Sequence, residues 1–186
     1  GSILGWAVGI GISGLAFGTL ADDADELLEN NPQLRDYFAT LGGGTLADLF
    51  LATVLAYLVL AGAGFLLQSV LRLRGEETSG RAELSLVAGA SRVRYLLGHV
   101  SVSAGGVVLL LLVAGASLGL SYALTIGDAG QVARMSWAAL AYIPAVFVVG
   151  AAALALFGLA GRRAVLAWAL LAYFIVELML GSVLQL

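Results

Sequence analysis

Residues 46–71 read LADLFLATVLAYLVLAGAGFLLQSVL, an apolar run in which Asp48 is the only charged residue. A helix needs roughly 20 mostly apolar residues to cross the hydrocarbon core of a bilayer, so this run is long enough. A strand of a membrane barrel would be about ten residues long and would alternate apolar with polar side chains. The run is apolar on all faces and about twice as long as such a strand, which predicts a membrane-spanning helix.

The same pattern occurs four more times along the chain, and we predict further spans at about residues 3–20, 100–122, 137–159 and 164–184. The 186 residues are 61% hydrophobic and only 11% charged, with a mean hydropathy of +1.01. So few polar groups could not cover the surface of a soluble fold of this size. The expected fold class is all-α: a polytopic transmembrane helical bundle of about five spans, forming one transmembrane domain over 1–186 in the lipid bilayer.

The charged and metal-ligating residues exclude several functions. The net charge is −3, so the chain lacks the basic surface that binding to nucleic acid requires. The ATP-binding P-loop needs a lysine, and the chain has none, so an ATP-driven step must come from another chain or a missing segment. One histidine without cysteine cannot build an ordinary zinc site. We expect no catalytic residues, no metal and no cofactor on this chain.

The placement of arginine predicts the orientation, because cytoplasmic loops carry an excess of basic residues. Seven arginines lie on one side of the predicted spans: Arg72, Arg74, Arg81, Arg92, Arg94, Arg162 and Arg163. The opposite loops carry only Arg35 and Arg134. We therefore place the N-terminus in the cytoplasm and the C-terminus outside, and we expect that at least one further span is missing. The first span could instead be a cleaved signal peptide, but no basic residue precedes it and its apolar run is long.

Residues 21–45 form the predicted outer loop. It opens with acidic residues between Asp22 and Glu29, continues with apolar residues at intervals up to Leu41, and ends in Gly42–Gly44. This pattern predicts one or two short amphipathic helices on the outer membrane face. The alternative is a solvated acidic loop.

Glycines recur at helical spacing in the first and third predicted spans, at Gly5, Gly9, Gly14, Gly18, Gly115 and Gly119. At 100° per residue, Gly5 and Gly9 lie on one face of the first span, and Gly14 and Gly18 lie on roughly the opposite face. Small residues let neighbouring helices approach closely in a membrane, so we predict helix packing at these glycines. The stretch from Gly9 to Gly14 also fits the dinucleotide fingerprint GxGxxG, but no strand precedes it and it lies inside a span.

Two residues inside predicted spans are candidates for a functional site. Glu177 lies past the midplane of the fifth span, where an ionisable group is costly and usually faces the bundle interior or water. The alternative is a structural glutamate near the outer headgroups. Pro144 should kink the fourth span, because proline lacks the amide that the helix needs. That kink either widens a cavity or is purely structural.

Residues 72–99 form the predicted cytoplasmic loop, RLRGEETSGRAELSLVAGASRVRYLLGH. A charged opening precedes a stretch from Gly80 to Leu97 that is compatible with a short amphipathic helix beneath the bilayer. Such a helix can offer apolar side chains to a partner's groove, while charges at the rim set the register. The alternative is an interfacial helix that only anchors the spans. The EExxxR motif at Glu76 resembles intramembrane proteases of the CAAX-processing type, but that class needs several histidines and the chain has only His99.

This loop is similar to the coupling-helix region of type-2 ABC exporter permeases. Five residues fit the first part of the family's pattern and two fit the later part: Glu77, Gly80, Arg81, Glu83, Leu86, Ser91 and Arg92. Ala88–Ala90 replace the proline-containing turn that these permeases often have. The acidic outer segment and the loop at Gly127 and Asp128 also resemble actinobacterial polyketide-antibiotic exporter permeases, so the likeness covers nearly the whole chain.

The resemblance implies a permease subunit of an ATP-driven exporter in the bacterial plasma membrane, which moves hydrophobic or amphipathic antibiotics or drugs out of the cell. In the family, one half has six spans, two halves form the pathway, and separate nucleotide-binding subunits hold ATP and Mg. This chain would be a partial half, with Glu177 and Pro144 on the translocation path. The residues expected to contact the ATPase subunits are Glu76, Glu77, Gly80, Arg81, Glu83, Leu84, Leu86, Ser91, Arg92 and Arg94. The alternative is a non-transporting membrane scaffold or assembly subunit that docks a cytoplasmic partner.

Overall fold

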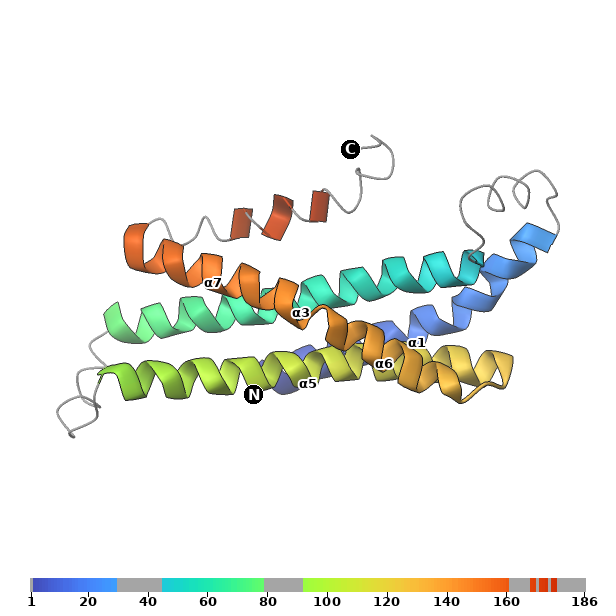
Figure 1. Ribbon diagram of the computed structural model, residues 1–186, viewed down its shortest axis with the longest axis horizontal. Helices are drawn as coiled ribbons and strands as arrows, with labels where there is room; N and C mark the ends of the chain where they lie inside the picture. Colours follow the sequence, from blue (N-terminus) through green and yellow to red (C-terminus); the bar gives the residue numbers. More distant parts are fainter. Residues whose placement is uncertain are drawn as a thin grey trace. The chain divides into compact units, whose positions relative to one another are not determined.

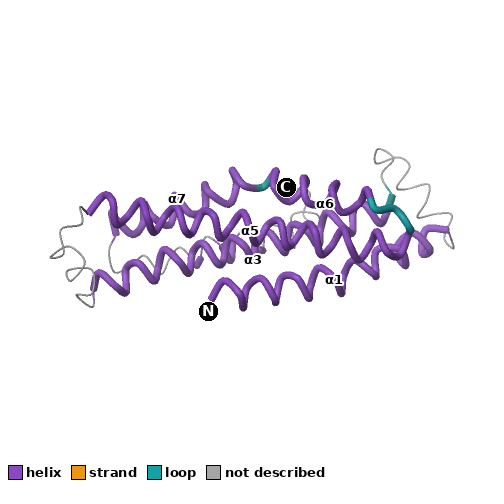
Figure 2. Tube along the Cα trace, turned by 90° about the horizontal axis from the view of Figure 1, so that it is seen from below, coloured by secondary structure: helices purple, strands orange, loops and turns teal. Residues whose placement is uncertain are grey.

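A computed structural model describes residues 2–29, 45–78, 92–160, 168–169, 171–173 and 175–176. Within these ranges every regular element is a helix and no strand occurs, which confirms the all-α prediction. Figure 1 follows the helices along the chain, and Figure 2 shows the same helices as tubes.

The helices in chain order are α1 (Ser2–Glu29), α3 (Leu46–Thr78), α5 (Arg92–Ile126), α6 (Gly130–Ala141) and α7 (Ile143–Ala160). Four segments are long and apolar enough to cross a membrane, namely Ile3–Ala21, Leu46–Arg72, Gly98–Ile126 and Gly130–Ala155. They correspond to the first four predicted spans. Most of the predicted fifth span, 164–184, lies outside the described residues.

Helix α1 continues past the predicted end of the first span as far as Glu29. The stretch from Leu20 to Glu29 contains neither glycine nor proline and is rich in alanine, leucine and glutamate, which favour a helix. Nothing in the local sequence therefore ends the helix at the membrane edge. The first part of the outer segment predicted at 21–45 is an extension of α1, and residues 30–44 lie outside the described part of the chain.

Contacts within the chain divide it into two compact units. The first unit comprises Gly1–Val59 and Leu110–Tyr142, so it contains α1, the first part of α3, the second part of α5, and α6. The second unit comprises Leu60–Leu109 and Ile143–Leu186, so it contains the remainder of α3 and α5 together with α7. The longest helices thus contribute to both units.

Apolar side chains fill the core of each unit and also cover its surface. Leu51, Leu110 and Leu118 are fully buried in the first unit, and Leu67 is fully buried in the second. On the surface, large apolar residues such as Val102, at 77% exposure, face outward. An apolar surface of this kind is unfavourable in water and suits the hydrocarbon of a bilayer.

Glycines bring α1 against α5 in the first unit. A Cβ at Gly14 would overlap the side chain of Ser117, and one at Gly18 would stand 2.6 Å from the carbonyl oxygen of Leu118. The Ser121 hydroxyl donates a hydrogen bond to the carbonyl oxygen of Leu15 at 2.6 Å, across the same contact. The face of α1 that carries Gly14 and Gly18 is therefore closed against α5 with no room for a larger residue.

The opposite face of α1 has no such neighbour in the part of the chain that is described. Gly5 and Gly9 are exposed, and apart from the neighbouring backbone of α1 itself no described atom lies within 4 Å of the position that a Cβ would take. The packing role predicted for these two glycines stays a prediction.

Helices α5 and α6 form a hairpin whose backbones touch. A Cβ at Gly115 would stand 2.5 Å from the carbonyl oxygen of Met135, and one at Gly119 would stand 2.6 Å from that of Gln131. Gly127 makes the turn with a φ of 75°, a conformation that glycine adopts without strain. The two glycines of α5 thus lie where α6 packs most closely.

A break at Tyr142 separates α6 from α7 within one apolar segment. Pro144 is the second residue of α7 and has no amide to donate to the carbonyl oxygen of Leu140. The amide of Tyr142 bonds to the carbonyl oxygen of Ala139 at 3.1 Å, which is the tighter spacing of a 3₁₀ turn. The structure therefore shows a helix interruption where the sequence predicts a kink.

Candidate docking and translocation sites

Helices α3 and α5 extend past their apolar segments at the arginine-rich end. α3 continues from Arg72 to Thr78, and α5 begins at Arg92, ahead of the apolar segment that starts at Gly98. Each extension adds about 9 Å of helix at 1.5 Å per residue. The loop predicted at 72–99 is therefore helical at both ends, and the last part of the short helix predicted there belongs to α5. Residues 79–91 lie outside the described ranges.

The charges on these two extensions oppose the dipoles of their helices. Glu76 and Glu77 lie in the last turn of α3, where the partial negative charge of a helix C-terminus disfavours them. Arg92 and Arg94 lie in the first turn of α5, where the partial positive charge disfavours basic residues. The helix dipoles therefore do not stabilise these four charges.

His99 joins the two helices near the base of the extensions. Its Nε2 lies 3.2 Å from the carbonyl oxygen of Ser69, and because a carbonyl oxygen only accepts, Nε2–H is the donor. Ser69 precedes Arg72 by less than one turn of α3, and His99 directly follows Gly98 at the start of the apolar part of α5. The hydrogen bond joins α3 to α5 near the point where the two extensions begin.

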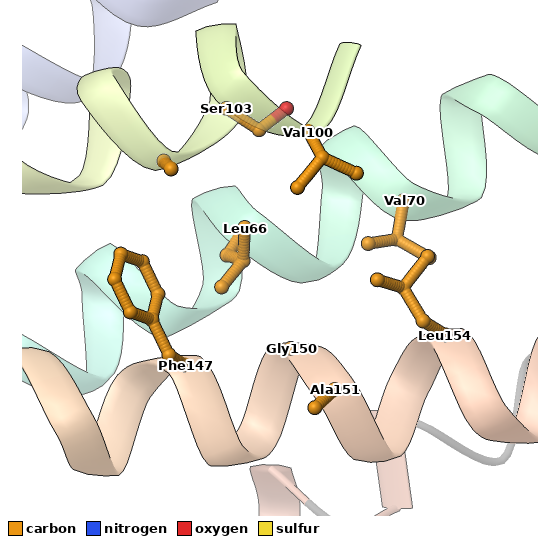
Figure 3. A pocket seen from close by; sticks show the side chains of 9 residues that line it. Leu66, Val70, Val100, Ser103, Phe147, Gly150, Ala151 and Leu154 are labelled. Carbon is orange, nitrogen blue, oxygen red and sulfur yellow. The ribbon is translucent and has the colours of Figure 1, made fainter. Parts of the chain in front are cut away.

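An apolar cavity of about 250 Å³ lies between α3, α5 and α7 in the second unit (Figure 3). The residues that line it are Leu66, Val70, Val100, Ser103, Ala104, Phe147, Gly150, Ala151 and Leu154. A Cβ at Gly150 would overlap the side chain of Leu66, so only glycine at this position allows α7 to lie so close to α3. The sequence carries no local signal for this cavity, because the cavity depends on three helices that only folding brings together.

A network of polar side chains joins α6 to the opposite end of α3. The carboxylate of Asp128 accepts hydrogen bonds from the Gly130 amide and from Gln131 Nε2, each at 2.9 Å. Gln131 Oε1 accepts one from Arg134 Nη1 at 3.0 Å, and Arg134 Nη2 forms an ion pair with Asp48. The sequence marks Arg134 only as an outer basic residue, because a partner 86 positions away leaves no local pattern.

A family model matches residues 1–186, and its description is "Multidrug efflux system permease Rv1217c, C-terminal domain". The chain belongs to this family. The Multidrug efflux system permease protein Rv1217c of Mycobacterium tuberculosis (strain ATCC 25618 / H37Rv) is 35% identical to this chain over 185 residues. The match covers 98% of the chain and 34% of the relative, so the chain spans about one third of the length of that protein.

Membership of the efflux-permease family confirms the exporter-permease resemblance drawn from residues 72–94 and their surroundings. It also agrees with the apolar helices, which together with the family identify a multi-pass membrane protein. The helices are expected from the apolar pattern of the chain, and the family from the resemblance of residues 72–94 and their surroundings.

The predicted site residues of this permease domain fall into three groups according to where they lie. Glu76, Glu77, Arg92 and Arg94 lie on the two helix extensions. Pro144 is exposed at the start of α7 and does not line the cavity, whose first residue on α7 is Phe147. The others lie outside the described residues: Gly80, Arg81, Glu83, Leu84, Leu86, Ser91 and Glu177. The roles assigned to all of these residues stay predictions.

Proposed function

We propose that this chain forms part of the permease of an ATP-driven exporter that moves hydrophobic or amphipathic compounds out of the cell through the bacterial plasma membrane. The Mycobacterium tuberculosis relative is, by its printed name, a multidrug efflux system permease protein, and it is similar to this chain along nearly all of the chain's length. Transport of this class therefore has the support of the family, while the ATP-driven mechanism rests on the charged residues at the arginine-rich end.

The observation that carries the proposal is the pair of helix extensions at the arginine-rich end. Each extension continues its helix about 9 Å beyond the apolar segment, to a level where a water-soluble partner has access. Glu76 and Glu77 border segment 79–91 on one side, and Arg92 and Arg94 border it on the other. A protein with complementary charges would relieve the conflict between these residues and their helix dipoles.

The partners are two nucleotide-binding subunits and a second transmembrane half, on the same or another chain. ATP and Mg bind to the nucleotide-binding subunits, since this chain has no lysine with which to build a P-loop. Closure of those subunits on ATP pushes segment 79–91, and α3 and α5 carry the motion into the membrane. The hydrogen bond from His99 to Ser69 keeps the two helices moving together.

Charge reversal tests this proposal. The quadruple variant Glu76→Lys, Glu77→Lys, Arg92→Glu and Arg94→Glu is compared with the wild-type permease for co-purification with its nucleotide-binding subunit and for ATP-dependent efflux of a hydrophobic dye. We expect at least a tenfold loss of both, because each charge contact with the partner becomes a repulsion. Asp22→Lys with Asp23→Lys, on the predicted outer side, is the control and should retain both.

Two outcomes contradict the proposal in different ways. Normal association and efflux in the quadruple variant would show that the helix extensions do not bind the ATPase. Association of the wild-type protein with a partner but without any ATP-dependent efflux would support the membrane scaffold instead.

A further inference from the structure

The apolar cavity lies in the part of the molecule that faces the arginine-rich end. Val70 precedes Arg72 by two positions on α3, and Val100 directly follows His99 on α5. With the arginine-rich end in the cytoplasm, the cavity lies at the level of the inner leaflet. A compound dissolved in the inner leaflet can reach this level without leaving the membrane.

The lining of the cavity selects for a neutral, apolar group. None of its nine residues is charged, and Ser103 contributes the only polar side chain among them. A charged group would lose its hydration in this space without gaining an ionic partner, which is costly. The hydroxyl of Ser103, which is 7% exposed, provides one hydrogen-bonding group for a ligand that is otherwise apolar.

The dimensions of the cavity select for a compact ring system. A cavity of about 150 Å³ lined by apolar residues binds benzene, so about 250 Å³ holds a somewhat larger group. In Figure 3 the side chains of Phe147 and Leu154 point from α7 toward α3 on either side of Gly150. These two residues are about 10 Å apart along the helix.

We propose that the cavity between α3, α5 and α7 binds the neutral fused-ring portion of an aromatic small molecule, such as a naphthyl group. The ring system lies among the lining side chains beside Leu66, and Phe147 provides an aromatic side chain against which it packs. This inference rests on the proposed function, since it names the substrate class that the exporter loads and the place where loading occurs.

Photolabelling of the purified permease in lipid nanodiscs, with no nucleotide, tests the inference. The probe is a neutral naphthyl diazirine, and the labelled peptides are identified by mass spectrometry. We expect saturable labelling of peptides that contain Leu66, Phe147 or Leu154, displaced by excess naphthyl compound without the diazirine. The same probe with a quaternary ammonium group should label these peptides at least tenfold less.

Two cavity-filling variants and one matched control define the site. Ala104→Leu and Ala151→Leu each add a side chain that projects from the lining, and each should reduce the saturable labelling at least tenfold. Ala151 is exposed, so its variant is expected to fold even if Ala104→Leu does not. Ala52→Leu makes the same change at an exposed position of α3 in the first unit and should label like the wild-type protein.

Three results would overturn the inference: labelling that does not saturate, labelling unchanged in well-folded Ala151→Leu protein, or displacement by phospholipid rather than by the naphthyl competitor. The last would identify an acyl chain as the occupant. Because labelling requires no ATPase subunit, its failure beside normal efflux removes only the cavity assignment. Saturable labelling without any efflux removes only the proposed function.

Discussion

At the scale of single residues, the helix contacts of the first unit depend on glycines, which have no side chain to keep the helices apart. Gly14 and Gly18 allow α1 to touch α5, and Gly115 and Gly119 allow α6 to touch it. In lipid, neighbouring helices gain little from the hydrophobic effect, so close packing of backbones supplies much of the attraction. A larger side chain at any of these positions would push the two helices apart and remove their backbone contact.

Gly115→Ala should destabilise the protein by about 1–3 kcal/mol, because the new Cβ meets the backbone of α6 and not a flexible side chain. Gly105→Ala is the control on the same helix, since no described atom lies within 4 Å of its Cβ position. That variant should be neutral, or more stable by up to about 1 kcal/mol from the higher helix propensity of alanine. Unfolding in detergent–denaturant mixtures measures both, and equal stability of the two variants would contradict this account.

The ion pair between Asp48 and Arg134 should contribute only modestly to the stability of the fold, since the two side chains are 37% and 48% exposed. A double-mutant cycle with Asp48→Asn and Arg134→Gln should give a coupling energy of about 0.2–1 kcal/mol at low salt. The coupling should shrink at 1 M salt, where the screening length is about 3 Å. A coupling that is zero at low salt, or that salt does not change, would show that the pair does not join α6 to α3 in solution.

At the scale of helices, the interruption beside Pro144 divides one apolar segment between the two compact units. α6 belongs to the first unit, where it packs on Gly115 and Gly119, and α7 belongs to the second, where it borders the cavity. Each half of the segment therefore has its own set of neighbours. Proline at position 144 separates them by removing a single backbone hydrogen bond.

Pro144→Ala restores an amide that can donate to the carbonyl oxygen of Leu140, so the helix should become continuous through Tyr142. Hydrogen–deuterium exchange of the peptide that covers 141–147 should slow at least tenfold. Tyr142→Ala keeps the proline and should exchange like the wild-type protein. Fast exchange in Pro144→Ala would mean that the break has another cause, and reduced efflux by a well-folded Pro144→Ala protein would support the predicted place of Pro144 on the translocation path.

The sequence predicted the helices well and the ends of the helices poorly, for a physical reason. Apolar composition reports where the chain meets hydrocarbon, so it located the spans. It does not report where a helix stops, and α1 and α3 continue into charged residues as far as Glu29 and Thr78. The glycine spacing indicated close contacts but not their partners. The ion pair of Arg134 and the cavity beside Gly150 each need residues from distant segments. A single sequence does not show which distant segments lie side by side.

At the scale of the whole molecule, the distribution of arginine predicts which end lies in the cytoplasm. The helix extensions that carry Glu76, Glu77, Arg92 and Arg94 fall at that end, and the turn between α5 and α6 falls at the other. Both the docking proposal and the loading of the cavity from the inner leaflet depend on this orientation.

Single-cysteine labelling tests the orientation, and the chain contains no cysteine of its own. Thr78→Cys should react with a membrane-impermeant maleimide only in inside-out vesicles, because position 78 ends the extension of α3. Ala129→Cys, in the exposed turn before α6, should react only in right-side-out vesicles. Reaction of Thr78→Cys from the outside would reverse the orientation and remove the basis for ATPase docking at 79–91.

The hairpin of α5 and α6 also bears on how the protein is made. Its contacts join neighbours in the chain, so it can close as soon as α6 has left the ribosome. The hydrogen bond from Ser121 to Leu15 spans 106 positions, so α1 enters the membrane long before its partner has been synthesised. During that interval the glycine face of α1 is open to the insertion machinery and its chaperones. The slow step of biogenesis is therefore expected to be the return of the first helix to the finished hairpin.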